Sequence, residues 1–458
     1  MNKKYNVYDI FIFLIISGAM LYLGIRAYSL DIFHDEALTY IYLIGAYKLL
    51  KLFLSKWQLL IGMLLMIFNP FLLEVLSAAR GYALGLAFLT IGLYYIFVKI
   101  DKFEQDKGYY TACSVLMMFG AVLSHLTFVY VYLTAIIILF LLEIIKILKD
   151  SQSCGYIKPL LKKAALHTFL PILSSMLLLA AIYYKPPILI NFRQASLDIA
   201  ARTGFWQDTV TSLINSILYG QKYYWDTMTF GKILILVSIL SGMFIIIWEI
   251  QRGKAADLIR NKFPWILLML FVCTFGIVLQ VAVFNTSVYV IERYAIFYIP
   301  MFSLFLLMLW KYILSHYHKY IAAATTAFMC LLTGVLMLHF IKSANLQYSF
   351  IYREDAYTKE VLNMIVEETK KYNLPPDTIR IGISWTFEPG INFYILKNNL
   401  YWIRFVDRSG PYNIFDFYYV LEQDKKKLEP YNLIKFIKKY DITRTPDAPN
   451  YSYFGALK

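Results

Sequence analysis

Charged side chains are scarce in this chain. Asp, Glu, Lys and Arg make up 16% of the 458 residues, whereas apolar residues make up 59%. In soluble domains about a quarter of the residues are charged, and rarely more than about half are apolar. The composition therefore excludes an ordinary soluble globular protein and indicates a polytopic membrane protein.

Acidic residues are fewer than basic ones, which gives a formal net charge of +14. A basic balance alone would also fit a nucleic-acid-binding protein. Here, however, the Lys and Arg residues lie between apolar runs, where they act as topology signals and contact anionic lipid. We therefore expect membrane lipid, and no nucleic acid, as a partner.

Cysteine is rare as well, with four residues in the chain. Cys113, Cys273 and Cys330 lie within apolar runs, Cys154 lies in a basic loop, and the polar C-terminal segment has none. No CxxC pair and no Cys/His spacing of a metal site occurs, so the sequence implies no disulfide framework. A glycine-rich phosphate-binding motif, a low-complexity segment and a convincing internal repeat are also absent.

Long apolar runs are what the chain has instead. A helix that crosses a bilayer needs about 20 apolar residues. Eleven runs are candidates, namely 8–28, 38–54, 58–76, 83–99, 110–124, 126–147, 166–185, 232–250, 264–284, 294–312 and 321–341. The stretch 110–147 is split at "LSHLTF" because it is too long for one helix. The first run lacks a convincing cleavage site and is interpreted as a retained signal anchor.

The basic residues between these runs are distributed unevenly. If the N-terminus lies inside, the inner loops and helix ends hold most of the Lys and Arg residues, including Lys48, Lys99, Lys149, Arg252 and Lys311. The positive-inside rule therefore predicts a cell-membrane protein with a cytoplasmic N-terminus. After eleven spans, the C-terminal segment lies on the extracytoplasmic side.

The C-terminal segment has no apolar run long enough to span a bilayer. "DAYTKEVLNMIVEETKKYN" (355–373) has helical periodicity, and "YNLIKFIKKY" (431–440) fits a second amphipathic helix. "TIRIGISW" (378–385), "LYWIRFV" (400–406) and "FDFYYVLE" (415–422) are typical of strands. We therefore expect an all-α multi-pass membrane domain over 1–341 and a small extracytoplasmic α/β domain over 342–458.

Polar and ionisable residues gather in the turns that are predicted to lie on the outer side. They are Asp35, Glu36, Glu74, Arg80, Tyr82, His125, Lys185, Arg293 and Tyr294. Charges near bilayer depth are costly unless they are paired or face an aqueous cavity. Their recurrence in several outer turns predicts one shared cavity at the outer interface.

The charged members of this set, and His125, also have a purely structural interpretation. Asp35 and Glu36 suit a helix cap and first turn, and Arg80 and Lys185 suit anchors at the membrane interface. Glu74 could pair with Arg80, and Glu292 with Arg293. His125 suits a polar position at a helix end. The residues alone leave both interpretations open.

As a set, these acids and cations suit one kind of reaction. A carboxylate pair beside the membrane supplies a general base whose pKa depends on partial burial and on its neighbour. Arg and Lys at the same depth hold a phosphate, and Arg does so bidentately. The set therefore suits a lipid-phosphate-linked substrate, in which cations stabilise the departing phosphate while a carboxylate deprotonates an attacking hydroxyl.

Four stretches resemble motifs of the GT-C superfamily of membrane glycosyltransferases. They are "FHDEALTY", "NPFLLEVLSAARGYALGLAF", "LSHLTF" and "ERYAIFYIPMFSLF", in this order within residues 5–312. They are similar to an acidic Asp-Glu motif, an outer turn with Arg-x-Tyr, a His-bearing turn and the Arg-Tyr start of a late helix. The chain is most similar to the bacterial relatives of protein mannosyltransferase and of lipid A aminoarabinose transferase (glycosyltransferase family 39/83-like).

The resemblance implies an inverting transfer of a sugar from a polyprenyl-phosphate-linked donor to an acceptor lipid, glycan or protein on the outer face. By motif position, Asp35 is the expected general base, Glu36 its neighbour that orients the acceptor or a metal, and Glu74 the second acid. Arg80 and Arg293 are expected to contact the lipid phosphate. The expected substrate- and phosphate-binding set also includes Tyr82, His125 and Tyr294, together with Lys185, which is included by its position alone because no local motif contains it.

The chain departs from this family in one respect. Relatives have a longer outer segment after the acidic motif, with amphipathic interfacial helices that help to shape the acceptor site. In this chain the apolar run resumes at Ala37 and Leu38. The way in which an acceptor would bind is therefore not evident from the family pattern.

Two other functions stay open, a transporter or flippase of lipid-linked substrates and a non-catalytic membrane scaffold or sensor. Transporters often carry paired repeats and polar residues near mid-membrane, whereas the charges here cluster at one face. A scaffold would use the C-terminal segment, which lacks an obvious binding motif. A divalent metal at the carboxylate pair and His125 also stays open, because no strong ligand spacing identifies one.

Overall fold

The fold is that of a computed structural model. It describes residues 11–12, 14–19, 21–22, 36–77, 81–103, 108–154, 161–162, 164–183, 203–223, 226–284, 288–344, 350, 353–372, 374–429, 433–442 and 450–457. The chain divides into two compact units. The first, Met1–Tyr219 with Tyr223–Ala344, is called the membrane unit, and the second, Gly220–Lys222 with Asn345–Lys458, is called the C-terminal unit.

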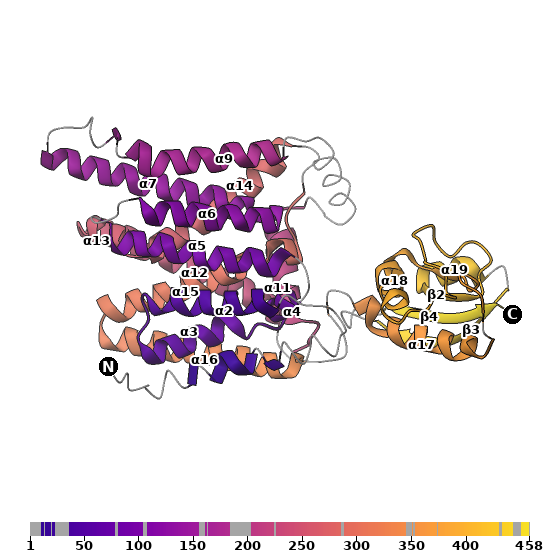
Figure 1. The fold of residues 1–458 in the computed structure, drawn as a ribbon. Coiled ribbons are helices and arrows are strands. Elements are labelled where there is room, and N and C mark those ends of the chain that lie inside the picture. The colour runs from indigo at the N-terminus through magenta and orange to yellow at the C-terminus, as the bar shows by residue number, and fades with distance from the viewer. Residues whose placement is uncertain are drawn as a thin grey trace, which may run out of the picture. The chain divides into compact units, whose positions relative to one another are not determined.

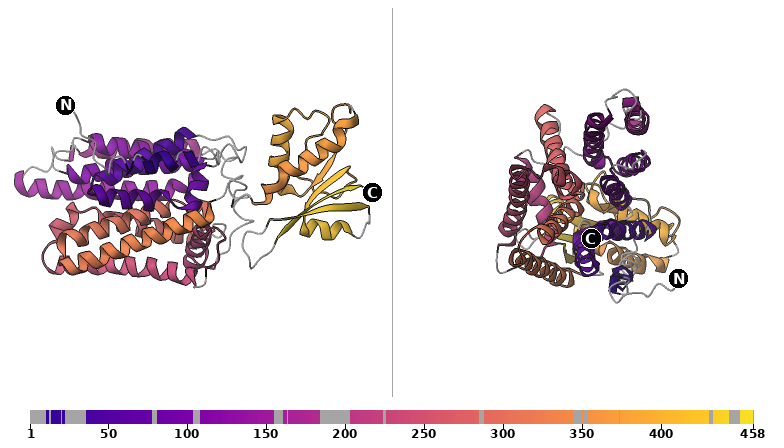
Figure 2. Two further views of the ribbon diagram at one scale, coloured as in Figure 1. Left: turned by 90° about the horizontal axis from the view of Figure 1, so that it is seen from below. Right: turned by 90° about the vertical axis from the view of Figure 1, so that its left-hand side faces the viewer.

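The membrane unit consists of helices that run side by side (Figures 1 and 2). Among the described residues, seven helices are long and apolar enough to cross a membrane, or eight if a bent pair forms one span. These spans contain α5 (Gly81–Asp101), α7 (Val129–Cys154), α9 (Leu170–Tyr183), α12 (Thr227–Gln251), α14 (Phe263–Val283), α15 (Tyr298–His316) and α16 (Lys319–Ser343). The chain is therefore a multi-pass helical membrane protein.

Two further apolar helices are shorter. Both α2 (Glu36–Lys51) and α6 (Tyr109–Ser124) have 16 residues, and they lie within or close to the predicted runs 38–54 and 110–124. The first predicted run, 8–28, is helical wherever the structure describes it. The total of eleven spans stays a prediction.

The helices differ in how much of their surface is covered by the protein. In α5 and α15, 72% of the apolar window is buried, whereas the value is 17% in α9, 22% in α12 and 11% in α16. Lipid tails are as apolar as leucine, so a peripheral span needs no polar face. We therefore place α5 and α15 in the centre of the bundle and the other three against lipid.

One span is broken. Helix α3 (Lys56–Ile67) and helix α4 (Pro70–Ser77) meet at an angle of 71°. Pro70 has no N–H to continue the helical hydrogen bonds of α3. The Asn69 side chain compensates at the break, since its Oδ1 accepts a hydrogen bond from the Leu72 N–H at 3.1 Å.

The C-terminal unit contains a mixed four-stranded sheet in the order β1-β2-β4-β3. Its strands are β1 (Ile381–Ile383), β2 (Phe417–Leu421), β3 (Ile434–Asp441) and β4 (Tyr451–Leu457). Strands β1 and β2 are parallel, with Ile383 opposite Tyr419, and the other two pairs are antiparallel. The parallel pair is possible because a helix connects the two strands.

Helices cover both faces of this sheet (Figure 2). The larger core joins α17 (Thr358–Thr369) and α18 (Glu388–Lys397) to one face, with Phe387 and Tyr419 stacked at 3.9 Å. The opposite face packs Val420 and Tyr453 against Leu428 of α19 (Glu422–Leu428). The expectation of a small α/β domain is confirmed.

Two local predictions in this unit are wrong. Residues 434–441 form strand β3 rather than a helix, because pairing with β4 decides a pattern that suits both periods. A bulge between Phe436 and Lys438 also disturbs the strand alternation. Residues 400–406 form no named strand, and their described sheet pairing is one isolated parallel bridge between Ile403 and Ile379.

Candidate functional site

One end of the membrane unit, called here the Tyr82 end, brings together several predicted site residues. It is formed by α4, the first turn of α5, the last turn of α6, the amphipathic helix α11 (Thr211–Leu218) and the short helix η4 (Glu292–Ala295). Figure 1 shows α4 and α11 at the same end of the bundle. These elements come from distant parts of the sequence, as expected for a site at one face of a bundle.

Three rings meet at the Tyr82 end. The rings of Tyr82 and His125 are stacked with their centroids 4.0 Å apart, and Tyr294 lies 6.3 Å from Tyr82 and 5.8 Å from His125. All three residues were predicted for the site from sequence. They form an aromatic group, called the Tyr82 triad, in which Tyr82 is buried and only His125 and Tyr294 are partly exposed, so these two rings could contact a ligand.

The triad depends on a close approach of two helices. A Cβ atom at Gly81 would lie 1.9 Å from the backbone oxygen of Ser124, which only glycine can accommodate. The start of α5 therefore meets the end of α6, and Tyr82 comes next to His125. The sequence "RGY" thus positions a tyrosine directly after the contact that brings it to its partner.

His125 also has a structural role. It ends α6, and its Nδ1 accepts a hydrogen bond from the Thr127 N–H at 3.4 Å and lies 2.9 Å from Thr127 Oγ1. The interpretation as a satisfied polar residue at a helix end therefore fits. The stack with Tyr82 is an additional contact that this interpretation does not require.

Glu74 is a buried carboxylate at this end. It lies on α4, is 1% exposed, and its Oε2 accepts a hydrogen bond from the Tyr219 hydroxyl. Tyr219 follows α11 in the left-handed region, with φ 53°. A buried carboxylate needs such partners because removing it from water is costly.

Besides Glu74, two further groups hold the segment around Tyr219, and the first of them is His339. The buried His339 of α16 has its Nε2 2.8 Å from the Ile217 oxygen and its Nδ1 2.5 Å from the Tyr223 hydroxyl. Because a carbonyl only accepts, Nε2 carries the proton and Nδ1 accepts from Tyr223. His339 thus caps a free carbonyl at the end of α11.

The third contact comes from η4. The backbone N–H of Glu292 donates to Ser212 Oγ at 3.1 Å. This bond links α11 to the segment that carries Arg293 and Tyr294. The guanidinium of Arg293 lies 5.3 Å from the Tyr294 ring centroid, a cation–π distance.

Local effects shift the pKa values of two groups in the loop that follows α11. Burial raises the pKa of Tyr223 above its usual value near 10. Hydrogen bonds from Thr229 lower the pKa of Asp226, which caps helix α12 through its Oδ1 at 3.0 Å from the Thr229 N. Both shifts are explained by local structure and do not by themselves indicate catalysis.

Several predicted site residues lie outside the described residues. Asp35, Arg80 and Lys185 are among these positions, and for Glu36 only the backbone at the start of α2 is described. The structure therefore brings Tyr82, His125 and Tyr294 together, with Arg293 beside Tyr294, and places Glu74 at the same end. The chemical roles of all nine residues, and the shared cavity, stay predictions.

Two functional candidates were missed from sequence, Tyr219 and His339. His339 had a usable signal, because an ionisable residue inside an apolar run is expensive without a partner. Tyr219 had a weaker one, the Tyr-Gly pair that ends an amphipathic segment. Among the described residues no group of three His, Cys, Asp or Glu side chains could hold a metal ion.

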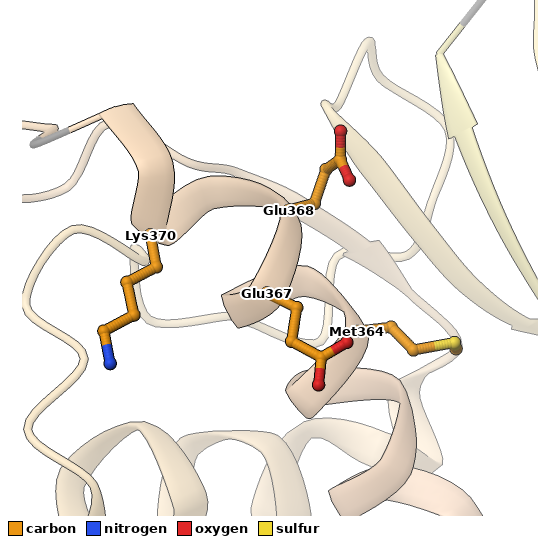
Figure 3. Close-up of a pocket in the computed structure, with 4 residues that line it drawn as sticks. All are labelled: Met364, Glu367, Glu368 and Lys370. Atoms are coloured by element: carbon orange, nitrogen blue, oxygen red, sulfur yellow. The ribbon is translucent and has the colours of Figure 1, made fainter.

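A depression in the C-terminal unit is not a convincing second site. It has a volume of about 700 Å³ and is lined by Met364, Glu367, Glu368 and Lys370 at the end of α17. Figure 3 shows that the two glutamates point in different directions and that Lys370 points away from Glu368. Groups that do not converge on one point make a poor binding site.

Comparisons with known proteins add no family. No protein-family model, no curated protein and no solved structure matches this chain. The length and apolar character of its helices define it as a multi-pass helical membrane protein. Anything finer depends on the chemistry of the site.

Proposed function

We propose that the protein is an integral membrane glycosyltransferase. It would move a sugar from a polyprenyl-phosphate-linked donor to an acceptor lipid, glycan or protein on the outer face of the membrane, with inversion. The observation that carries the proposal is the assembly of the Tyr82 triad, Arg293 and the buried Glu74 at one end of the bundle. The motif resemblance to GT-C enzymes supports the same conclusion.

The residues divide the work by chemical type. Asp35 is proposed as the general base and Glu36 as its neighbour, while Glu74 is the second acid. Arg80, Lys185 and Arg293 are proposed to stabilise the departing lipid phosphate. The partly exposed rings of His125 and Tyr294 are proposed to contact the sugar or the acceptor, with the buried Tyr82 behind them.

A groove on the lipid-facing helix α12 supports a lipid-linked donor. It has a volume of about 370 Å³ and is lined by Val237, Leu240, Ser241, Phe244 and Ile245. Nearly all of this lining is apolar, so it suits a hydrocarbon chain rather than a sugar. We propose that a prenyl chain lies along this helix while its phosphate is held at the Tyr82 end.

The distribution of basic residues supports the proposed orientation. The ends of α2, α5, α12 and α15 opposite the Tyr82 end carry Lys51, Lys99, Arg252 and Lys311. By the positive-inside rule, that opposite end faces the cytoplasm. The Tyr82 end then faces outward, where an undecaprenyl-type donor would present its sugar.

The proposal is tested by mass spectrometry of surface glycans and of the polyprenyl-phosphate-sugar pool in cells. Asp35→Asn and Glu74→Gln are compared with wild type at matched expression. Loss of a general base or acid typically lowers the rate by about 10²–10⁴-fold. We expect one sugar to disappear from a glycoconjugate while its lipid-linked donor accumulates.

Asp226→Asn is the matched control. Asp226 is an exposed carboxylate at the same end, and its described contact is with the start of its own helix. This variant should leave both pools as in wild type. Unchanged pools in Asp35→Asn and Glu74→Gln cells would refute the glycosyltransferase.

Transport of a lipid-linked substrate is the second candidate, favoured by one observation. Lys99 and Glu143 form an ion pair at 3.3 Å between α5 and α7, with side chains only 3% and 12% exposed. Buried ionisable pairs occur in transporter pathways. If the lipid-linked sugar accumulated on only one leaflet of the membrane in the variant cells, while sugar transfer to the glycoconjugate stayed unchanged, this alternative would be favoured.

A further inference from the structure

The parallel pair of strands in the C-terminal unit creates a place where ligands commonly bind. The chain leaves β1 toward α18 on one face of the sheet and leaves β2 toward α19 on the other face. Adjacent parallel strands whose connections diverge in this way form a switch point. In open α/β sheets, ligands bind outside the carboxyl ends of such strands.

A polar network occupies this point. Ser384, directly after β1, donates through Oγ to Asp424 Oδ2 at 2.5 Å and accepts from the Leu421 N–H at 2.9 Å. The Tyr412 hydroxyl donates to the other Asp424 oxygen at 2.9 Å. Ser384 and Asp424 are 0% and 6% exposed, so this network is a rigid floor rather than a mobile surface.

Two exposed aromatic residues adjoin this network, one next to it in the chain and one hydrogen-bonded to it. Trp385 follows Ser384 and is 56% exposed, and Tyr412 is 55% exposed although its hydroxyl is bound to Asp424. Gly410, with φ 88°, lies against the Tyr412 ring, where a Cβ would come within 2.7 Å of the ring. Lys427 Nζ also lies 5.5 Å from the centroid of the Tyr412 ring, so Gly410 and the ammonium hold the ring while more than half of the side chain stays exposed.

The charges beside these rings are neutralised in pairs. Arg408 places Nε and Nη2 at 3.3 Å from Glu388 Oε2, and Lys427 lies 3.7 Å from Asp424 and 3.2 Å from the Tyr412 hydroxyl. Trp385, Glu388, Arg408, Tyr412 and Lys427 are called the strand-end patch. A patch with paired charges suits a neutral ligand better than an anion, because an anion would have to compete with the carboxylates.

We propose that the strand-end patch binds a glycan. A pyranose ring has an apolar face that stacks on an indole or phenol, and hydroxyl groups that bond to carboxylates, guanidinium and ammonium groups. Trp385 and Tyr412 supply the stacking faces, while Glu388, Arg408 and Lys427 supply the polar partners.

In the proposed glycosyltransferase, this glycan is the acceptor or a part of a longer acceptor, and this assignment rests on the proposed function. Glycan binding itself does not. The patch would supply the acceptor recognition that the shortened segment after Glu36 leaves unexplained. It would do so outside the reacting centre, so Trp385 and Tyr412 are binding residues and not catalytic ones.

The test is binding of the full-length protein to a printed array of microbial oligosaccharides. The protein is placed in lipid nanodiscs, because glucoside and maltoside detergents would compete for the site. We expect wild type to bind a set of neutral glycans. We expect Trp385→Ala and Tyr412→Ala to weaken binding at least about tenfold, and Trp385→Phe to keep part of it.

Tyr401→Ala is the matched control. Tyr401 is 68% exposed in the same unit, but its carbonyl accepts from Asp377 N–H near the amino end of β1. The Tyr401→Ala variant should bind glycans as wild type does. The proposal fails if wild type binds no glycan, if Trp385→Ala and Tyr401→Ala bind alike, or if only phosphorylated or sulfated glycans bind and high salt releases them.

Glu74→Gln separates this proposal from the proposed function. This variant should bind the same glycans as wild type, because Glu74 lies in the membrane unit. Normal glycan binding with normal sugar transfer in Glu74→Gln cells would refute the proposed catalytic role of Glu74 and keep the glycan site. If sugar transfer is lost in Glu74→Gln cells and the wild-type protein binds no glycan, the catalytic role of Glu74 is kept and the glycan site is refuted.

Discussion

The two ends of the membrane unit bury polar groups in different ways. At the end opposite the Tyr82 end, Lys99 donates to Glu143 at 3.3 Å and to Thr111 at 2.8 Å, and Thr168 donates to Glu143 at 2.9 Å. This group, called the Lys99 cluster, joins α5, α6, α7 and the π-helical turn Ala165–Phe169. At the Tyr82 end the contacts given above are ring contacts, the cation–π contact of Arg293 and hydrogen bonds from neutral donors.

The difference indicates a division of labour. A buried ion pair with additional hydrogen bonds ties four helical segments together and leaves little freedom for chemistry. At the Tyr82 end, the partly exposed rings of His125 and Tyr294 leave a surface that a ligand can use. We therefore expect substitutions in the Lys99 cluster to affect stability most, and substitutions at the Tyr82 end to affect function at smaller cost in stability.

The largest effect is expected from breaking the Lys99 cluster on one side. Lys99→Met should lower the free energy of unfolding by about 3–5 kcal/mol, because it leaves the buried Glu143 without its cation. Lys99→Met with Glu143→Leu should recover most of the loss. Thermal unfolding of the purified protein measures both, and a double variant as unstable as Lys99→Met alone would contradict the ion-pair account.

A smaller effect is expected from Gly81→Ala. The added Cβ collides with the Ser124 oxygen, so α5 and α6 must separate beside the Tyr82 triad, at about 1–3 kcal/mol. Gly334→Ala in α16 is the control, since nothing lies within 4 Å of its Cβ position. It should stabilise the helix by up to about 1 kcal/mol. Equal midpoints of thermal unfolding for the two variants would show that the helix contact is not tight.

The third effect, which is confined to one segment, is expected from His339→Phe. The Ile217 carbonyl and the Tyr223 hydroxyl lose their partner, which costs about 1–3 kcal/mol locally. Hydrogen exchange should rise in residues 211–223 and stay unchanged in α5. His316→Phe at the opposite end, where Nδ1 bonds to the Tyr312 oxygen, should leave 211–223 protected. Unchanged exchange in His339→Phe would show that α11 is held by other contacts.

Much of the helical framework could be predicted from sequence. Residues 83–99 and 321–341 were predicted as spans, and the structure has α5 over Gly81–Asp101 and α16 over Lys319–Ser343. In a membrane, the helix is the favourable structure for a long, uniform apolar run, because it satisfies the backbone hydrogen bonds within the segment. The same runs alternate in direction, which already places Tyr82, His125 and Tyr294 at one end.

The remaining part depends on contacts between distant segments. Nothing in the sequence near Tyr219 indicates that its hydroxyl reaches Glu74, because this bond depends on how α11 packs against α4. In the C-terminal unit, the pattern of residues 434–441 fits a helix and a strand equally, and only the partner strand β4 decides. Strand β4 itself, Tyr451–Leu457, was not predicted.

The break between α3 and α4 has a consequence for the position of Glu74. Most backbone N–H groups of a regular helix are bonded along its axis, so bending it elsewhere would break such bonds. At this break, Pro70 has no N–H, the Asn69 N–H bonds back to the Ile67 oxygen at 2.9 Å, and the Asn69 side chain serves Leu72. The break therefore turns α4 by 71° while the N–H groups of Asn69 and Leu72 stay bonded, and it directs Glu74 into the protein, where the residue is 1% exposed.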